Sequence, residues 1–206
     1  MSAASVVLLA RGGQDRALSW ARHGLATVAV VPLAGGWTGV CPVSDRAVAG
    51  PPFDDPVAAL LARPMPRRML PTIGIAVIGA RLAVACVPAV LRPRPRWLVW
   101  EPGTGTVRPG PLTPGSVGTL AAAAGARQAR DMATSILRDG RGDATRVAAD
   151  LFTALRLPGL ELFLGADDPL AAPGAVLVEP AREDVARFER TAHEVRRWRE
   201  EVEGSR

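Results

Sequence analysis

The stretch from Thr72 to Leu91 constrains the fold more than any other part of this 206-residue chain. It holds twenty residues with a single charge, Arg81, and arginines flank it on both sides. A membrane-spanning helix needs about 20 apolar residues, and a central arginine costs it about 2.5–3.5 kcal/mol. Gly74, Gly79 and Pro88 further disfavour a helix. The sequence therefore predicts two buried strands joined at Gly79-Ala80, and no membrane association.

The rest of the first half alternates short apolar runs with glycine and proline breaks, which is typical of a β-rich region. A helix is expected near the start, with Asp15 as its N-cap, and the Asp55-Pro56 pair predicts the start of a second helix. Pro32 is expected to close the second strand. The predicted strands cover residues 6–10, 25–31, 37–43, 73–78, 82–87 and 97–100.

The second half has a different texture. Residues 116–138 are alanine-rich and predicted helical, Asp143 predicts the cap of a second helix, and residues 182–203 predict a long charged helix. Residues 101–115 contain four prolines and four glycines, which favours a linker or exposed loop.

These patterns predict an α+β protein. Its N-terminal half would form a mixed or mostly antiparallel sheet with helices on one face, and its C-terminal half would be helix-rich. The chain divides into a basic region, 1–108, and a helix-rich region, 116–206, or forms one compact domain over 1–206.

Composition also indicates the type of source organism and the cellular compartment. All 25 basic residues are arginine, and lysine, asparagine and tyrosine are absent, which indicates a high-GC genome such as that of an actinobacterium. Residues 1–108 carry 12 arginines against 5 acidic residues, and residues 109–206 carry 13 against 15. The N-terminus lacks the basic start of an export signal, and Cys41 and Cys86 are far apart. We therefore expect a cytoplasmic protein with two free thiols.

No motif predicts catalysis or a cofactor. Gly103–Arg108 resembles a nucleotide loop, but prolines follow where a helix should begin. Arg11–Arg16 offers a helix N-terminus to an anion, but no Walker-type lysine is present, and we favour an ordinary glycine-rich turn. Asp15, Ser19 and His23 lie along one helical face, too far apart for a catalytic relay. The histidines and cysteines lack the spacing of a metal site, so we expect no metal and no cofactor.

Two features remain as candidate binding surfaces. The first is an extended strip in which arginine alternates with proline and two tryptophans follow, a composition suited to phosphates and stacked bases or to a protein partner. Its residues are Arg92, Arg94, Arg96, Trp97 and Trp100. The second is the narrow apolar stripe of the terminal helix, suited to a partner helix. Its residues are Val185, Phe188, Val195, Trp198 and Val202.

Three functional hypotheses follow. The leading one is a non-enzymatic interaction or accessory protein that self-associates or binds another protein, because both surviving features are interaction surfaces. The second is a nucleic-acid-binding protein that uses the arginine strip. The third, an enzyme acting on a small molecule, requires a deep pocket with convergent polar groups that the sequence does not reveal.

Overall fold

The computed structural model describes residues 5–139, 141–166 and 168–204. Its centre is an eight-stranded sheet in the order β7-β6-β5-β4-β1-β3-β2-β8, and every neighbouring pair is antiparallel. The strands are β1 (Val6–Ala10), β2 (Val28–Leu33), β3 (Trp37–Pro42), β4 (Thr72–Ile78), β5 (Arg81–Val87), β6 (Arg96–Glu101), β7 (Gly105–Val107) and β8 (Val176–Val178). The predicted hairpin over residues 72–91 is confirmed as β4 and β5.

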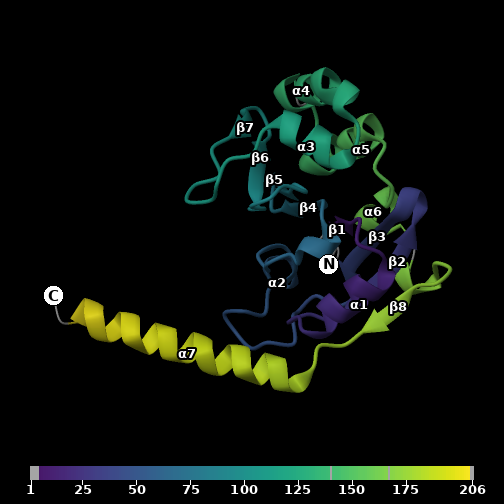
Figure 1. Cartoon of the computed structure of the whole chain (residues 1–206). Helices are drawn as coiled ribbons and strands as arrows, with labels where there is room; N and C mark the ends of the chain where they lie inside the picture. Colours follow the sequence, from purple (N-terminus) through teal and green to yellow (C-terminus); the bar gives the residue numbers. More distant parts are fainter. Residues whose placement is uncertain (1–4, 140, 167, 205–206) are drawn as a thin grey trace.

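Helices cover both faces of this sheet (Figure 1). The front half supplies α1 and α2 to one face, and the back half supplies α3 to α6 to the other, which confirms the α+β class. Within the described residues, no helix combines the length and the hydrophobicity that a bilayer span requires. The helices are α1 (Gln14–Arg22), α2 (Pro56–Leu61), α3 (Val117–Ala124), α4 (Arg130–Asp139), α5 (Ala144–Leu155), α6 (Leu160–Leu164) and α7 (Arg182–Gly204).

The central strand β1 shows why two helical layers are needed. Its residues are all buried, and successive side chains of a strand point to opposite faces. Val7 and Leu9 therefore join the cluster under α3 to α6, whereas Val6, Leu8 and Ala10 join the cluster under α1 and α2. A strand that is apolar at every position must be buried on both faces of the sheet.

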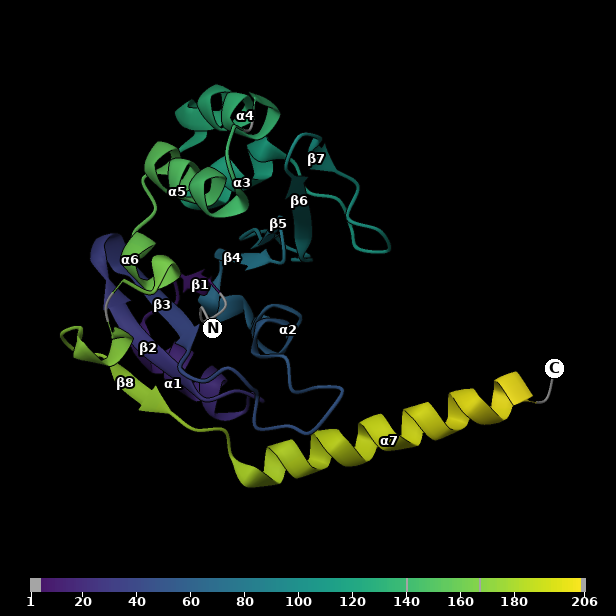
Figure 2. The ribbon, with the colours of Figure 1, turned by 180° about the vertical axis from the view of Figure 1, so that it is seen from behind.

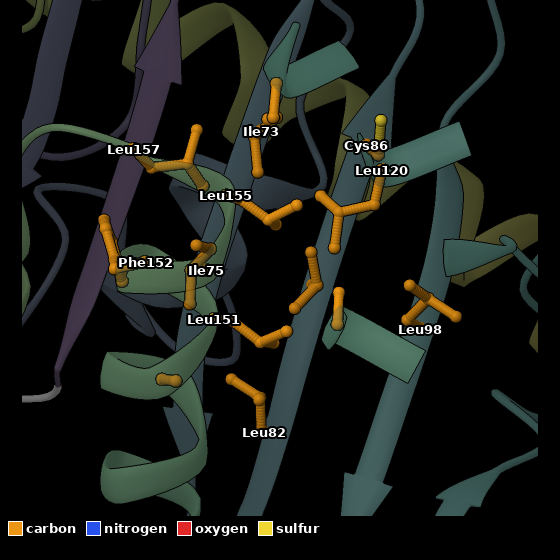
Figure 3. Packing of buried hydrophobic residues seen from close by; sticks show 14 of the residues in the cluster. Ile73, Ile75, Leu82, Cys86, Leu98, Leu120, Leu151, Phe152, Leu155 and Leu157 are labelled. Carbon is orange, nitrogen blue, oxygen red and sulfur yellow. The ribbon is translucent and has the colours of Figure 1, made fainter. Parts of the chain in front are cut away.

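The larger cluster joins the two halves of the chain (Figure 3). Leu151 and Leu155 of α5 pack against β-sheet residues such as Ile75 and Leu82, and all four are at most 1% exposed. Full burial of one such side chain contributes roughly 1.5–3 kcal/mol. The alanine-rich helices are thus held to the sheet by a common core.

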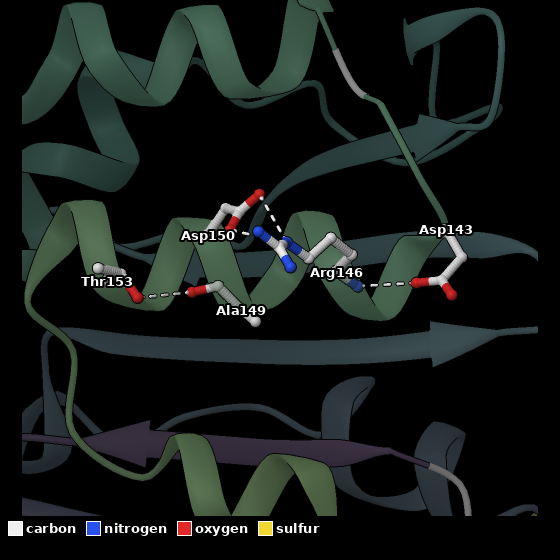
Figure 4. A network of polar contacts seen from close by, with 5 residues as sticks. All are labelled: Asp143, Arg146, Ala149, Asp150 and Thr153. Atoms are coloured by element: carbon white, nitrogen blue, oxygen red, sulfur yellow. Dashed lines mark hydrogen bonds and ion pairs between the residues drawn. The ribbon is translucent and has the colours of Figure 1, made fainter.

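Local chemistry sets the start of α5, as the sequence predicts (Figure 4). The Asp143 carboxylate accepts a hydrogen bond from the Arg146 backbone N–H at 2.8 Å. Arg146 pairs in turn with Asp150, one turn later, and the Thr153 hydroxyl donates to the Ala149 carbonyl. These groups occupy the solvent side of a helix whose other side is core.

Four local expectations are corrected. The cap of α1 is Gly13 and not Asp15, because the helix begins at Gln14 and Asp15 falls in its first turn. Pro32 continues β2, since β8 pairs only with residues 28–30 and leaves that part of β2 with one neighbouring strand. The helix expected over 116–138 divides at Gly125, whose φ of 75° ends α3. Residues 101–115, expected as a loop, contain β7, which pairs with β6.

Candidate functional site

The arginine strip divides between a loop and a strand. Arg92 and Arg94 lie in the connection from β5 to β6, Arg96 begins β6, and all three are exposed. Trp97 is half-buried and packs against the α1 and α2 side of the sheet. Trp100 is 1% exposed in the cluster on the other face, so its ring is not accessible to a base or a partner while the protein is folded.

The geometry of β6 explains this difference between the tryptophans. Residues 97 and 100 are three positions apart, and an odd spacing places side chains on opposite faces of a strand. Arg96 and Trp97 are neighbours, so they also point to opposite faces. The structure therefore leaves Arg92, Arg94 and Arg96 as exposed cations, with Trp97 as the one partly accessible ring of the pair.

The surroundings of the strip add a residue that the spacing did not reveal. Arg67 donates from Nη2 to the carbonyl of Leu91 at 2.8 Å, which brings a further arginine beside the strip. Glu101 is the one acidic residue between positions 63 and 108, and its carboxylate pairs with Arg81 Nε at 2.6 Å. Between positions 63 and 108, the one carboxylate that could neutralise the strip is therefore already paired with Arg81.

The first turns of α7 are anchored to the body. Val185 is buried, and the ring of Phe188 meets that of Phe53 edge to face at a centroid distance of 4.9 Å. Glu189 accepts a hydrogen bond from the Gly50 backbone N–H at 2.8 Å. The predicted stripe residues Val185 and Phe188 therefore serve the chain's own packing.

The rest of α7 leaves the body. Figures 1 and 2 show the helix running outward, with its C-terminal end far from the sheet. Val195 is 46% exposed and Trp198 is 64% exposed, so the apolar stripe continues along the helix without cover from the described part of the chain. The side chain of Val202 lies outside the described residues.

His23 finds its carboxylate in α7 and not in α1. Its Nδ1 lies 2.7 Å from Oδ2 of Asp184, a contact across 161 sequence positions. The hydrogen bond from His23, with the charges of His23, Arg187 and Arg63, lowers the pKa of Asp184. The pair holds the first turns of α7 to the C-terminal end of α1, and Asp15 takes no part in it. We call α7 the arm and the rest of the described chain the body.

The cysteines are structural. Cys41 and Cys86 are free and buried, and burial raises the pKa of their thiols to about 11 and about 12. A thiol with a raised pKa is a poor nucleophile at neutral pH. Among the described residues, no group of three or more His, Cys, Asp or Glu side chains is placed to hold a metal ion.

Asp55 and Asp168, which each precede a proline, act as caps. Asp55 accepts from the backbone N–H groups of Val57 and Ala58 at the start of α2, and Asp168 accepts from Leu170. Both line a cavity of about 680 Å³ that also contains Asp45 and Asp54. The sequence spacing of Asp55 and Asp168 does not indicate that the two residues line one cavity.

Comparisons of the chain with protein-family models, with curated proteins and with solved structures find no match.

Proposed function

We propose that this protein is a non-enzymatic interaction protein that associates with a second copy of itself through the outer part of α7, residues 191–204. The observation that carries the proposal is the exposure of Trp198 and Val195 on a helix that has left its own body. Large apolar side chains on a projecting helix are unfavourable in water, and covering them with another surface lowers the free energy. A cytoplasmic location and a high-GC bacterial source belong to the same proposal and rest on composition.

The spacing of the stripe supports a helical partner. Val185, Phe188, Ala192 and Val195 follow one another at intervals of three, four and three residues, the repeat by which helices pair. An isolated helix of fewer than about 12–15 residues is marginal in water, so the outer part of α7 gains stability from pairing. Val185 and Phe188 of this stripe contact the body, and its continuation, Ala192 and Val195, would contact the partner. We call this stripe the seam.

Charge favours a second copy as that partner. Residues 182–204 contain six arginines and seven acidic residues, a balance of −1, while the whole chain is +5. Two arms therefore meet without net repulsion of consequence, whereas two basic bodies repel each other. Because α7 leads away from the body, contact between arms keeps the basic front regions apart.

Symmetry also increases the area available. Stable interfaces bury about 1,200–2,000 Å² in total, and a buried tryptophan supplies about 150–250 Å². A narrow stripe that contacts an unrelated surface buries less area than a stable interface needs. A two-fold arrangement uses each of its residues twice, on both partners.

Sedimentation velocity over a range of concentrations tests this proposal. We expect the wild-type chain to form a dimer and Val195→Asp to be monomeric, because a carboxylate in the seam stays unpaired. His193→Asp is the matched control, since two residues along a helix reach its opposite side and His193 is exposed. A wild-type chain that stays monomeric up to its solubility limit contradicts the proposal, as does equal dissociation of both variants.

Nucleic-acid binding is a second candidate function, favoured by the exposure of Arg92, Arg94 and Arg96 and by the pairing of Glu101, the one acidic residue between positions 63 and 108, with Arg81. Fluorescence anisotropy with labelled DNA and RNA across a salt series tests it. We expect affinity to fall steeply with salt, and to be lost when all three arginines become alanine. The control removes three exposed arginines elsewhere, Arg127, Arg130 and Arg141, and binding that weakens equally in both triple variants counts against this candidate.

A further inference from the structure

A cavity of about 520 Å³ opens where several chain segments end at one side of the sheet. The segments are the residue that follows β1, the turn between β2 and β3, and the C-terminal ends of α3 and α5. Ligand cavities in proteins commonly measure about 300–1,000 Å³, so the space suits a small organic molecule. It shares no residue with α7.

Arg11 lies in this cavity, stacked on an indole. Its guanidinium carbon is 4.7 Å from the centre of the Trp37 ring, and Trp37 is 4% exposed. The stack orients the guanidinium plane while the side chain remains exposed. Among the described residues, none accepts a hydrogen bond from this guanidinium or forms an ion pair with it. Its forked N–H donors are therefore fixed in orientation and free to bind.

The other stacked arginine of the chain shows the contrast. Arg63 lies 4.4 Å over Trp20, but it is half-buried and burial lowers its pKa to about 10, with Asp184 acting against that shift. That stack is a covered, structural contact near an acidic residue. The stack of Arg11 is exposed, and it faces a cavity whose described lining contains no acidic residue.

Arg156 is the second arginine of the lining, and its backbone conformation is a disfavoured one. It ends α5 with φ 52° and ψ 39°, the left-handed region in which a side chain is disfavoured. The other positive φ values of the described chain, twelve in number, all belong to glycine. Gly125 performs the same turn at the end of α3. A side chain kept in this conformation is a reason to look for a role for its charge.

The charges of the cavity are one-sided. Among the described residues, its lining includes Arg11, Arg156 and Gln128, but no aspartate or glutamate. The carbonyl ends of α3 and α5 carry partial negative charge, which favours the two arginines, so the guanidinium groups and not the helix ends must supply the attraction for an anion. Neither guanidinium is hydrogen-bonded to those carbonyls in the described structure, so both keep donors for another acceptor.

We propose that this cavity binds an oxyanion, carboxylate or phosphate, carried by a small organic molecule. Arg11 and Arg156 would hold the oxyanion, because planar guanidinium groups bind carboxylates and phosphates through paired N–H donors. Ala126, Pro158 and Leu160 line the same space and would contact the apolar part of the ligand. The proposal is limited to binding, and the described part of the lining contains no carboxylate, histidine or cysteine.

Isothermal titration calorimetry of the full chain with three probes tests this inference. The probes are inorganic phosphate, phenyl phosphate and benzoate, which separate the oxyanion from the apolar group and phosphate from carboxylate. We expect saturable 1:1 binding of at least one aromatic probe, stronger than that of inorganic phosphate. Loss of one charged hydrogen-bonding partner should weaken it about tenfold or more.

Two variants and one control make the test specific. Arg11→Gln removes the stacked guanidinium, and Arg156→Gly removes the second while glycine keeps the left-handed turn, so its fold is secure. Arg127→Gln is the control, an exposed arginine of η3 (Arg127–Ala129) outside the lining. Binding lost in both variants and kept in the control supports the site. Absence of saturable binding for every probe, or equal weakening in the control, overturns it. Neither result depends on the proposed dimerisation, because no described residue of α7 lines the cavity.

Discussion

The two parts of α7 carry the same apolar stripe but differ in what covers it. The first turns bury Val185 and place Phe188 against Phe53, while the outer turns leave Trp198 64% exposed. Apolar residues recur at intervals of three or four in both parts, and only contacts with distant residues distinguish the two parts. A periodic stripe therefore identifies a surface to be buried and does not identify its partner.

The sheet and its helices extend this contrast to the whole molecule. Leu151 and its neighbours are enclosed by two halves of the chain, whereas the outer part of α7 has no cover within the described chain. Local stability in proteins follows the density of buried contacts, from the global value in the core to almost nothing at frayed ends. We therefore expect three tiers of sensitivity to substitution.

The largest effect should come from the core. Leu151→Ala removes a side chain that is 0% exposed under the sheet and should lower the free energy of unfolding by about 2–5 kcal/mol. Met132→Ala on α4 is the control, because Met132 is 62% exposed and surface changes alter stability by about 0.5 kcal/mol or less. Urea denaturation followed by circular dichroism measures both. Equal effects would mean that the helical layer is not held by this core.

The anchor of α7 should show an intermediate effect. Phe188→Ala removes the edge-to-face contact with Phe53 and should destabilise the docked arm by about 1–2 kcal/mol. Hydrogen exchange should accelerate in residues 182–190 and stay unchanged in the sheet. Acceleration throughout the protein would show instead that arm and body unfold as one unit.

The same anchor should depend on pH through Asp184. Its pKa is lowered in the folded protein, first by the hydrogen bond from His23, so the carboxylate favours the docked arm above the pKa of the undocked chain. That contribution is present at neutral pH and is lost as the pH falls through the lowered folded value. Limited proteolysis of α7 across acidic pH measures the release. Asp184→Asn should remove the pH dependence, and an unchanged profile in this variant would rule out this carboxylate as its source.

The sequence predicted what local chemistry determines. Asp55 and Asp143 are confirmed as caps because a carboxylate before a helical pattern satisfies N–H groups two or three residues later. The hairpin of β4 and β5 is confirmed because twenty residues with one charge and a central glycine leave few alternatives.

Contacts between distant residues lay beyond such reasoning. The partner of His23 is Asp184, and the ring beneath Arg11 is Trp37, which belongs to another strand. Neither pair has a spacing that marks it, because the fold alone brings the segments together. The same holds for Trp100, whose place in the core depends on which face of β6 the helices cover.

The smallest effect on the single chain should come from the outer part of α7. Trp198→Ala should change the unfolding free energy of the dilute monomer by about 0.5 kcal/mol or less, because the ring is exposed there. At high concentration the wild-type Tm should rise, since dimerisation stabilises the folded state by mass action, and the Tm of the variant should not. Differential scanning calorimetry at two concentrations measures both terms. A loss of stability in dilute solution as large as that of Phe188→Ala would mean that Trp198 packs on its own body, and the two parts of α7 would then be alike.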